Sequence, residues 1–142
     1  MESFHPLVVH FPIALLLSAL LIDVLGLVLK RPGWHHIALW NLSLGTLGAA
    51  AAVLTGLQAE DVAKHSFEIW RVIELHKRLG ISTLILAIMV VTWRLRKRDH
   101  LSPRGRLATI VAMLIMASTL SVGASLGGRL VYELGVGSSF GR

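Results

Sequence analysis

Histidines are the residues of this chain best suited to bind a metal or carry a proton, and two of them open it. Near its amino end the sequence has His5-Pro6 and then His10-Phe11-Pro12, just before a long apolar run, while His76 precedes a second such run. A neutral imidazole is a ligand for haem iron and for divalent transition metals, and it titrates near neutral pH. The chain has no cysteine, which excludes thiolate ligands and c-type haem attachment within it.

Long apolar runs must position these histidines. Apolar residues make up 54% of the chain and charged residues 15%, and the apolar residues form blocks, which is typical of an integral membrane protein. A helix of roughly 20 residues crosses a hydrocarbon core. We therefore expect an all-α polytopic membrane protein, a single four-transmembrane-helix bundle over residues 1–142, with helices at about residues 6–29, 34–57, 79–95 and 107–126.

The basic residues gather in two of the connections. Both connections are expected on the cytoplasmic side, because cytoplasmic loops carry an excess of Lys and Arg. Both termini and the connection over residues 58–78 then face the outer side. The charge is thereby explained by topology, and nucleic acid is not expected as a partner. The residues concerned are Lys30 and Arg31 in one connection, and Arg94, Arg96, Lys97, Arg98, Arg104 and Arg106, with Asp99 as the only acid, in the other.

The outer connection has the pattern of an amphipathic helix. Apolar residues such as Phe67, Trp70 and Ile73 form one side, and Lys64, Glu68 and Arg71 lie away from it. The pattern predicts an interfacial helix at about residues 61–74, between the second and third membrane helices.

This topology places four histidines, His5, His10, His65 and His76, on the outer side. His10 lies about one turn inside the first helix and His76 about one turn before the apolar start of the third, so the two imidazoles could face each other near the outer interface. Gly80 follows His76 on the same helical face and permits close approach of a flat cofactor. We interpret the remaining three, His35, His36 and His100, as solvated or facing lipid headgroups.

Three interpretations of the outer histidines remain open. In the first, His10 and His76 are the two axial ligands of b-type haem. In the second, a divalent metal takes three or four ligands from the outer side, where the candidates are His5, His10, His65, His76, Glu74 and Glu133. In the third, the imidazoles bind backbone or headgroups and the chain holds no cofactor.

Asp23 is the acid inside a predicted membrane helix, where an unpaired charge is costly. Asn41 and Ser43 of the second helix fall at a similar depth and would form a buried polar contact that fixes helix register. The alternative is a contact with a proton or a quinol. Small residues on the second and fourth helices predict close packing of those helices, and the composition indicates no internal repeat.

Several of these residues resemble one family. His5-Pro6, His10-Phe11-Pro12-Ile13, Asp23, Gly56 with Glu60 and Asp61, and His76 are together similar to the domain of unknown function 2231 family of bacterial four-helix membrane proteins. The segment from Gly127 to Gly137 is also similar, but the family often has histidine where this chain has Leu134, which weakens a metal site there. The resemblance marks His5, His10, Asp23, His76, Tyr132, Gly135 and Gly137, and it implies a domain of the bacterial cytoplasmic membrane with respiratory or c-type cytochrome partners.

Our first functional hypothesis is an electron-transfer subunit that holds b-type haem between the first and third helices by His10 and His76, with His5 or Tyr132 near a propionate or a quinone. The second is a structural or assembly subunit of a larger redox complex without a cofactor, and the third is a divalent-metal carrier. Expected partners are the lipid bilayer and other membrane subunits of a redox complex or a cytochrome. No separate acid and base pair can be assembled, so enzyme activity is expected at most from a complex in which this chain is a non-catalytic subunit.

Overall fold

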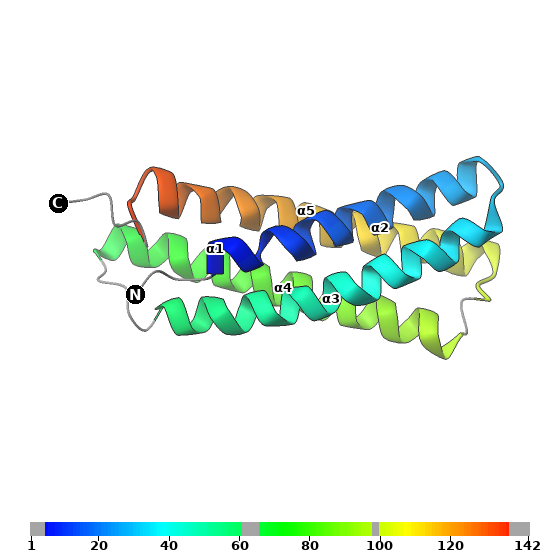
Figure 1. Ribbon diagram of the computed structural model, residues 1–142, viewed down its shortest axis with the longest axis horizontal. Helices are drawn as coiled ribbons and strands as arrows, with labels where there is room; N and C mark the ends of the chain where they lie inside the picture. The colour runs from blue at the N-terminus through cyan, green and yellow to red at the C-terminus, as the bar shows by residue number, and fades with distance from the viewer. Residues whose placement is uncertain (1–4, 61–65, 98–99, 137–142) are drawn as a thin grey trace.

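The chain folds into a bundle of four long helices. The computed structural model describes residues 5–60, 66–97 and 100–136. A one-turn helix, α1 (His5–Val8), is followed by α2 (His10–Val28), α3 (Pro32–Glu60), α4 (Phe67–Arg96) and α5 (Pro103–Tyr132). The long helices run alternately up and down in one elongated bundle, with both termini at the same end (Figure 1). All four are long and apolar enough to cross a membrane, so the predicted all-helical, four-helix membrane bundle is confirmed.

Helix boundaries follow capping residues. The hydroxyl of Ser66 accepts a hydrogen bond from the Ile69 amide at the start of α4, and that of Ser102 accepts one from the Gly105 amide at the start of α5. Proline is the first residue of both α3 and α5, where its missing N–H costs no helical hydrogen bond.

The interfacial helix predicted at residues 61–74 is not a separate element. Residues 67–74 form the first two turns of α4, and residues 61–65 lie outside the described residues. Ile73, expected on the membrane surface, is buried in the bundle, whereas Phe67 and Trp70 of the same apolar side are exposed. α5 likewise extends beyond the predicted residues 107–126 at both ends.

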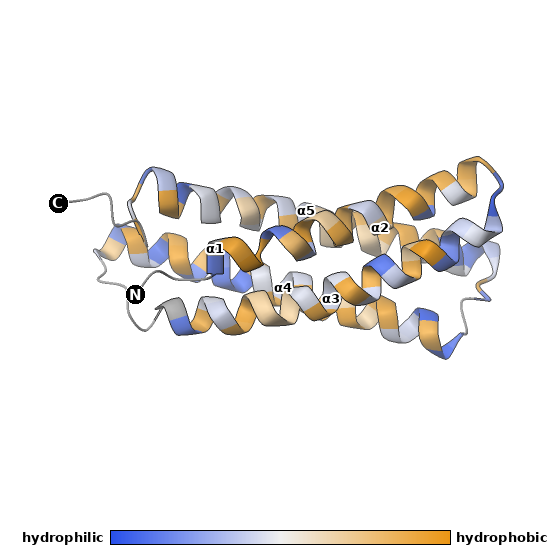
Figure 2. Cartoon of the chain, viewed as in Figure 1, coloured by the Kyte–Doolittle hydropathy of each residue, from blue (hydrophilic) through white to orange (hydrophobic). Residues whose placement is uncertain are grey.

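The core lies along the middle of the bundle. Leu16 and Leu42 from the first two long helices meet Met113 and Met116 of α5, and all four side chains are fully buried. Large apolar side chains such as Leu47 and Leu54 are exposed, as expected where lipid replaces water. Hydrophilic residues gather towards the two ends (Figure 2).

Neighbouring helices in sequence are neighbours in space. α2 packs on α3, α4 packs on α5, and contacts of α3 with α4 and of α2 with α5 join these two hairpins. α2 and α4 lie diagonally opposite, as do α3 and α5, and neither diagonal pair shares a close backbone contact among the described residues. The close packing expected of the second and fourth membrane helices is therefore not a contact between these two helices. Gly45 and Gly48 of α3 instead contact Leu16 and Phe11 of α2.

The two hairpins have the same arrangement of helices, and corresponding residues are 71 positions apart in the sequence. Identical residues at this interval include His5 and His76, Pro32 and Pro103, and Gly56 and Gly127. Diagonal helices correspond, so the hairpins are related by an approximate two-fold axis along the bundle. Composition does not reveal the repeat because few corresponding residues are identical, whereas their burial matches. Corresponding pairs in which both residues are buried include Pro12 and Thr83, Leu16 and Ala87, Ala19 and Val90, Leu39 and Ile110, and Leu42 and Met113.

Candidate functional site

Two histidines meet towards the end of the bundle at which α3 ends and α4 begins. The rings of His5 and His76 lie with their centroids 6.1 Å apart and their planes at 84°. The two residues correspond in the 71-residue repeat, so each hairpin contributes one imidazole to a place near the approximate two-fold axis. We call these two residues the histidine pair.

Each imidazole of the histidine pair rests against a glycine. A Cβ atom added at Gly56 of α3 would lie 3.0 Å from Cε1 of His5, and one added at Gly127 of α5 would lie 3.0 Å from Cε1 of His76. Gly56 and Gly127 also correspond in the repeat. In both hairpins, therefore, a glycine without a side chain leaves room for the histidine ring.

Hydrogen bonds fix which nitrogen of each neutral ring carries the proton. Nδ1 of His76 lies 2.8 Å from the Gly123 carbonyl oxygen, which can only accept, so Nδ1 donates. Nδ1 of His5 lies 3.1 Å from Oγ1 of Thr55, and the Thr55 hydroxyl itself donates to the backbone carbonyls of Ala51 and Ala52. With the Thr55 hydroxyl donating to a backbone carbonyl, its oxygen is an acceptor for Nδ1 of His5. In both neutral rings Nε2 keeps its lone pair, which is the arrangement of metal-binding histidines.

The environment of His5 favours this neutral form. Burial lowers the pKa of His5, and the nearby His76 lowers it further, while a backbone hydrogen bond with Ala52 acts in the opposite direction. His5 precedes the first membrane-spanning helix. An imidazole that stays neutral near pH 7 is available as a Lewis base.

A second polar centre lies towards the other end of the bundle. Asp23 of α2 is fully buried, and its Oδ1 lies 2.7 Å from Nδ1 of His35 on α3. The same oxygen lies 3.5 Å from Nη2 of Arg94 on α4 and 3.6 Å from Nη1 of Arg106 on α5. These four residues, the charged cluster, thus join all four long helices. Arg94 also donates from Nη2 to the His35 carbonyl oxygen at 2.6 Å.

The charged cluster follows the same repeat. Asp23 corresponds to Arg94, and His35 corresponds to Arg106, again at an interval of 71 residues. One hairpin therefore supplies the acid and the other supplies two guanidinium groups. Removing one partner of such a buried contact is destabilising, because the others then stay buried without compensation.

Comparison with known proteins decides the family. A family model described as "Predicted membrane protein (DUF2231)" matches residues 2–139. The chain belongs to this family. No curated protein and no solved structure matches it. The histidine pair, both glycines beside it and the charged cluster all fall within the matched residues, and the resemblance read from the sequence is confirmed.

In this DUF2231 protein the structure brings His5, rather than His10, to His76. His10 lies on α2, diagonally opposite α4, and its side chain is exposed. A Cβ atom at Gly80 would meet nothing within 4 Å, so the space beside this residue is open. Tyr132, at the end of α5, is 89% exposed. His65 lies outside the described residues, and those that are described contain no group of three His, Cys, Asp or Glu able to hold a metal ion.

The expected partners of Asp23 in this DUF2231 protein are wrong. Asn41 donates to the Ser18 hydroxyl, and Ser43 donates to the Leu39 carbonyl of its own helix. His35, expected to be solvated or near headgroups, is bound to Asp23 instead.

The two arginines of the charged cluster are indicated by the sequence only as loop charges, although Arg94 is fully buried and Arg106 nearly so. The signal that identifies them is the repeat itself, which aligns the one acid of the first helix with Arg94.

Proposed function

We propose that this DUF2231 protein is a small electron-transfer subunit of a membrane redox complex and binds b-type haem through His5 and His76. The proposal rests on one observation. The imidazoles of His5 and His76, which correspond in the repeat, lie next to each other, and hydrogen bonds at Nδ1 leave the Nε2 lone pair of each neutral ring available. Haem iron can be held by two neutral imidazoles. Two equivalent ligands from two equivalent hairpins suit that requirement.

The donor set favours haem iron over a divalent ion. Zinc and copper sites use three or four protein ligands, whereas the histidine pair supplies two, and the described residues hold no group of three candidate ligands. The open space at Gly80, four residues after His76, supports the approach of a macrocycle on that side. When bound, haem would supply one-electron transfer, while Thr55 and the Gly123 carbonyl would orient the two imidazoles.

The orientation of the bundle follows from its charges. The connection with Lys30 and Arg31 and the connection between α4 and α5 lie at the same end (Figure 1), and by the positive-inside rule we assign that end to the cytoplasm of a bacterial inner membrane. The histidine pair then lies at the outer end, where a cytochrome or a larger membrane subunit would exchange electrons with it. We assign exposed Tyr132 to contact with a propionate or a quinone at that end.

Haem content of purified variants tests this proposal. The chain is expressed with haem supply, and haem per chain is measured as the pyridine haemochrome for the wild type, His5→Ala, His76→Ala and the control His10→Ala. We expect a stoichiometric haem in the wild type and in the control, and its loss in the other two. A colourless wild type that copurifies with larger subunits would indicate the accessory-subunit function, and bound metal removed by a chelator would indicate the divalent-metal function.

A further inference from the structure

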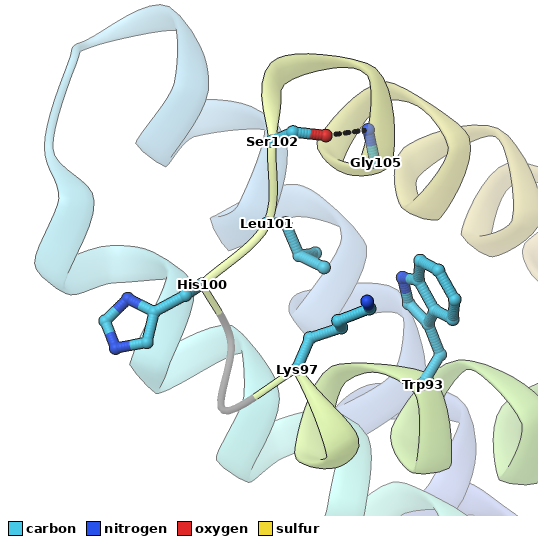
Figure 3. A pocket seen from close by; sticks show the side chains of 6 residues that line it. All are labelled: Trp93, Lys97, His100, Leu101, Ser102 and Gly105. Atoms are coloured by element: carbon cyan, nitrogen blue, oxygen red, sulfur yellow. Dashed lines mark hydrogen bonds between the residues drawn. The ribbon is translucent and has the colours of Figure 1, made fainter.

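A pocket that the proposed haem site does not use lies where α4 ends and α5 begins. Its volume is about 240 Å³. In Figure 3 the side chains of Trp93, Lys97 and Leu101 lie together on one side of the loop, and the His100 ring lies on the other side. The lining residues are Trp93, Lys97, His100, Leu101, Ser102 and Gly105.

Lys97 is the cation of this pocket. Its Nζ lies 5.4 Å from the centre of the Trp93 ring, a distance typical of a cation–π contact. The Ser102 hydroxyl caps the start of α5 by accepting from the Gly105 amide, so a bound anion would be held by the Lys97 ammonium rather than by the helix end. Trp93 and Leu101 add apolar surface beside this charge.

The pocket marks a departure from the repeat. Lys97 corresponds to Gly26 of the first hairpin, and Gly105 corresponds to Trp34. In the first hairpin the space beside Gly26 is taken by Cβ of Trp34 and by the His35 ring, which lie 3.1 and 3.2 Å from the place of a Cβ on Gly26. In the second hairpin glycine replaces the tryptophan and lysine replaces the glycine. A filled position has thus become an open one that carries a positive charge.

The surroundings indicate the kind of ligand. Arg96 and Arg104 are exposed on either side of the loop, and the basic Lys30–Arg31 turn lies at the same end of the bundle. Trp93 is 47% exposed at the end of a membrane helix, the depth at which tryptophan meets lipid headgroups. Basic pockets between membrane helices on the cytoplasmic side, to which we assign this end of the bundle, bind anionic headgroups.

We propose that this pocket binds the phosphate of an anionic lipid headgroup. Lys97 pairs with the phosphate, and Trp93 and Leu101 contact the glycerol and the first methylene groups. A free phosphate ion offers the same charge but lacks these apolar contacts, so the lipid is the ligand that uses the whole lining.

Native mass spectrometry of the full chain, released from detergent after incubation with phosphatidylglycerol or phosphatidylcholine, tests the proposal. Lys97→Gln removes the cation, and Gly105→Trp closes the pocket with the tryptophan of the first hairpin while keeping the charge. Lys30→Gln is the matched control, because it removes one positive charge from the same end of the bundle. Size-exclusion chromatography of each variant verifies the fold.

We expect the wild type to retain phosphatidylglycerol in preference to phosphatidylcholine, and both Lys97→Gln and Gly105→Trp to lower that retention by about fivefold, as for loss of one lysine contact at a membrane surface. Lys30→Gln should retain the lipid like the wild type. Equal retention in all four proteins would overturn the proposal. So would displacement of the lipid by millimolar inorganic phosphate, because the site would then belong to a soluble anion.

Discussion

Asp23 and Arg94 occupy corresponding positions in the two hairpins and face each other across the bundle with opposite charges. Both are fully buried, and Nη2 of Arg94 lies 3.5 Å from Oδ1 of Asp23. At the other end the corresponding residues His5 and His76 are identical, and their rings meet. Opposite charges can neutralise each other at one pair of corresponding positions, whereas the other pair brings together two identical imidazoles. The two ends of one repeat thereby serve different purposes.

Exchanging the charges of Asp23 and Arg94 should restore a contact that either single change destroys. Asp23→Arg or Arg94→Asp alone buries charges without compensation, which costs about 3–5 kcal/mol. The double variant Asp23→Arg with Arg94→Asp should recover a substantial part of that loss, because the positions correspond. Thermal unfolding in detergent measures the effect. Ser43→Ala, a control at a position that the sequence predicts to contact Asp23, should stay within about 0.5 kcal/mol of the wild type. Full stability of either single variant would contradict the assigned contact.

The glycines beside the histidine pair should not tolerate alanine. Gly56→Ala or Gly127→Ala places a Cβ 3.0 Å from a histidine Cε1, so the ring must move and haem binding should weaken by at least about tenfold, the effect of a disturbed outer shell. Gly80→Ala and Gly128→Ala meet nothing within 4 Å in the chain. Gly128→Ala should bind haem normally and gain about 0.5–1 kcal/mol of stability. Haem titration checks Gly56→Ala and Gly127→Ala against Gly128→Ala, and equal affinities in all three would remove the role assigned to the two glycines.

Thr55 should act as a positioning residue for His5. Thr55→Val keeps the shape but removes the oxygen that accepts from Nδ1 of His5, so the ring loses its fixed tautomer. Haem affinity should fall by about 10–100-fold, as for other lost partners of metal-binding histidines. The position of the reduced α-band and the redox potential should change as well. Thr55→Ser keeps the hydroxyl, so its haem affinity, α-band position and redox potential should match those of the wild type. If serine does not restore them, the methyl group of Thr55 rather than the hydrogen bond positions His5.

Stability of the haem-free chain should decrease as pH falls below about 6.5. The pKa of His5 is lowered from its ordinary value of 6.5 in the folded chain, so between the two pKa values the unfolded chain binds more protons. The free energy of unfolding therefore decreases as the pH is lowered through this window, and it becomes constant below the folded-state pKa. His5→Gln should flatten the dependence, and exposed His36→Gln should not. Unfolding midpoints from pH 8 to pH 5 test this, and parallel curves for the wild type and His5→Gln would refute it.

The sequence predicts the membrane helices well, because an apolar block of roughly 20 residues has the length that a membrane-spanning helix needs and exceeds that of most buried helices in soluble proteins. It also indicates that His5, His76 and Asp23 require partners. The partners themselves depend on which helices are adjacent, and apolar blocks carry no such information. The sequence suggests that α2 and α4 face each other through His10 and His76, but these helices lie diagonally.

The partners of Arg94 and Arg106 could not be predicted from the sequence either. Each lies at the edge of an apolar block, where a basic residue ordinarily marks a cytoplasmic loop, and only the fold reveals that both side chains turn inward to Asp23. The 71-residue repeat would have indicated both the pairing of His5 with His76 and that of Asp23 with Arg94. It is difficult to detect because the corresponding lipid-facing residues need only be apolar and are rarely identical.

Binding of haem by the histidine pair is best tested by an optical spectrum of the detergent-purified wild type, expressed with haem supply. The spectrum is recorded air-oxidised and again after dithionite reduction. We predict a Soret band that shifts on reduction and a sharp reduced α-band from low-spin, bis-imidazole iron, both lost in His5→Ala and in His76→Ala. A featureless spectrum of the wild type, or bands that survive both substitutions, would show that these two histidines are not haem ligands.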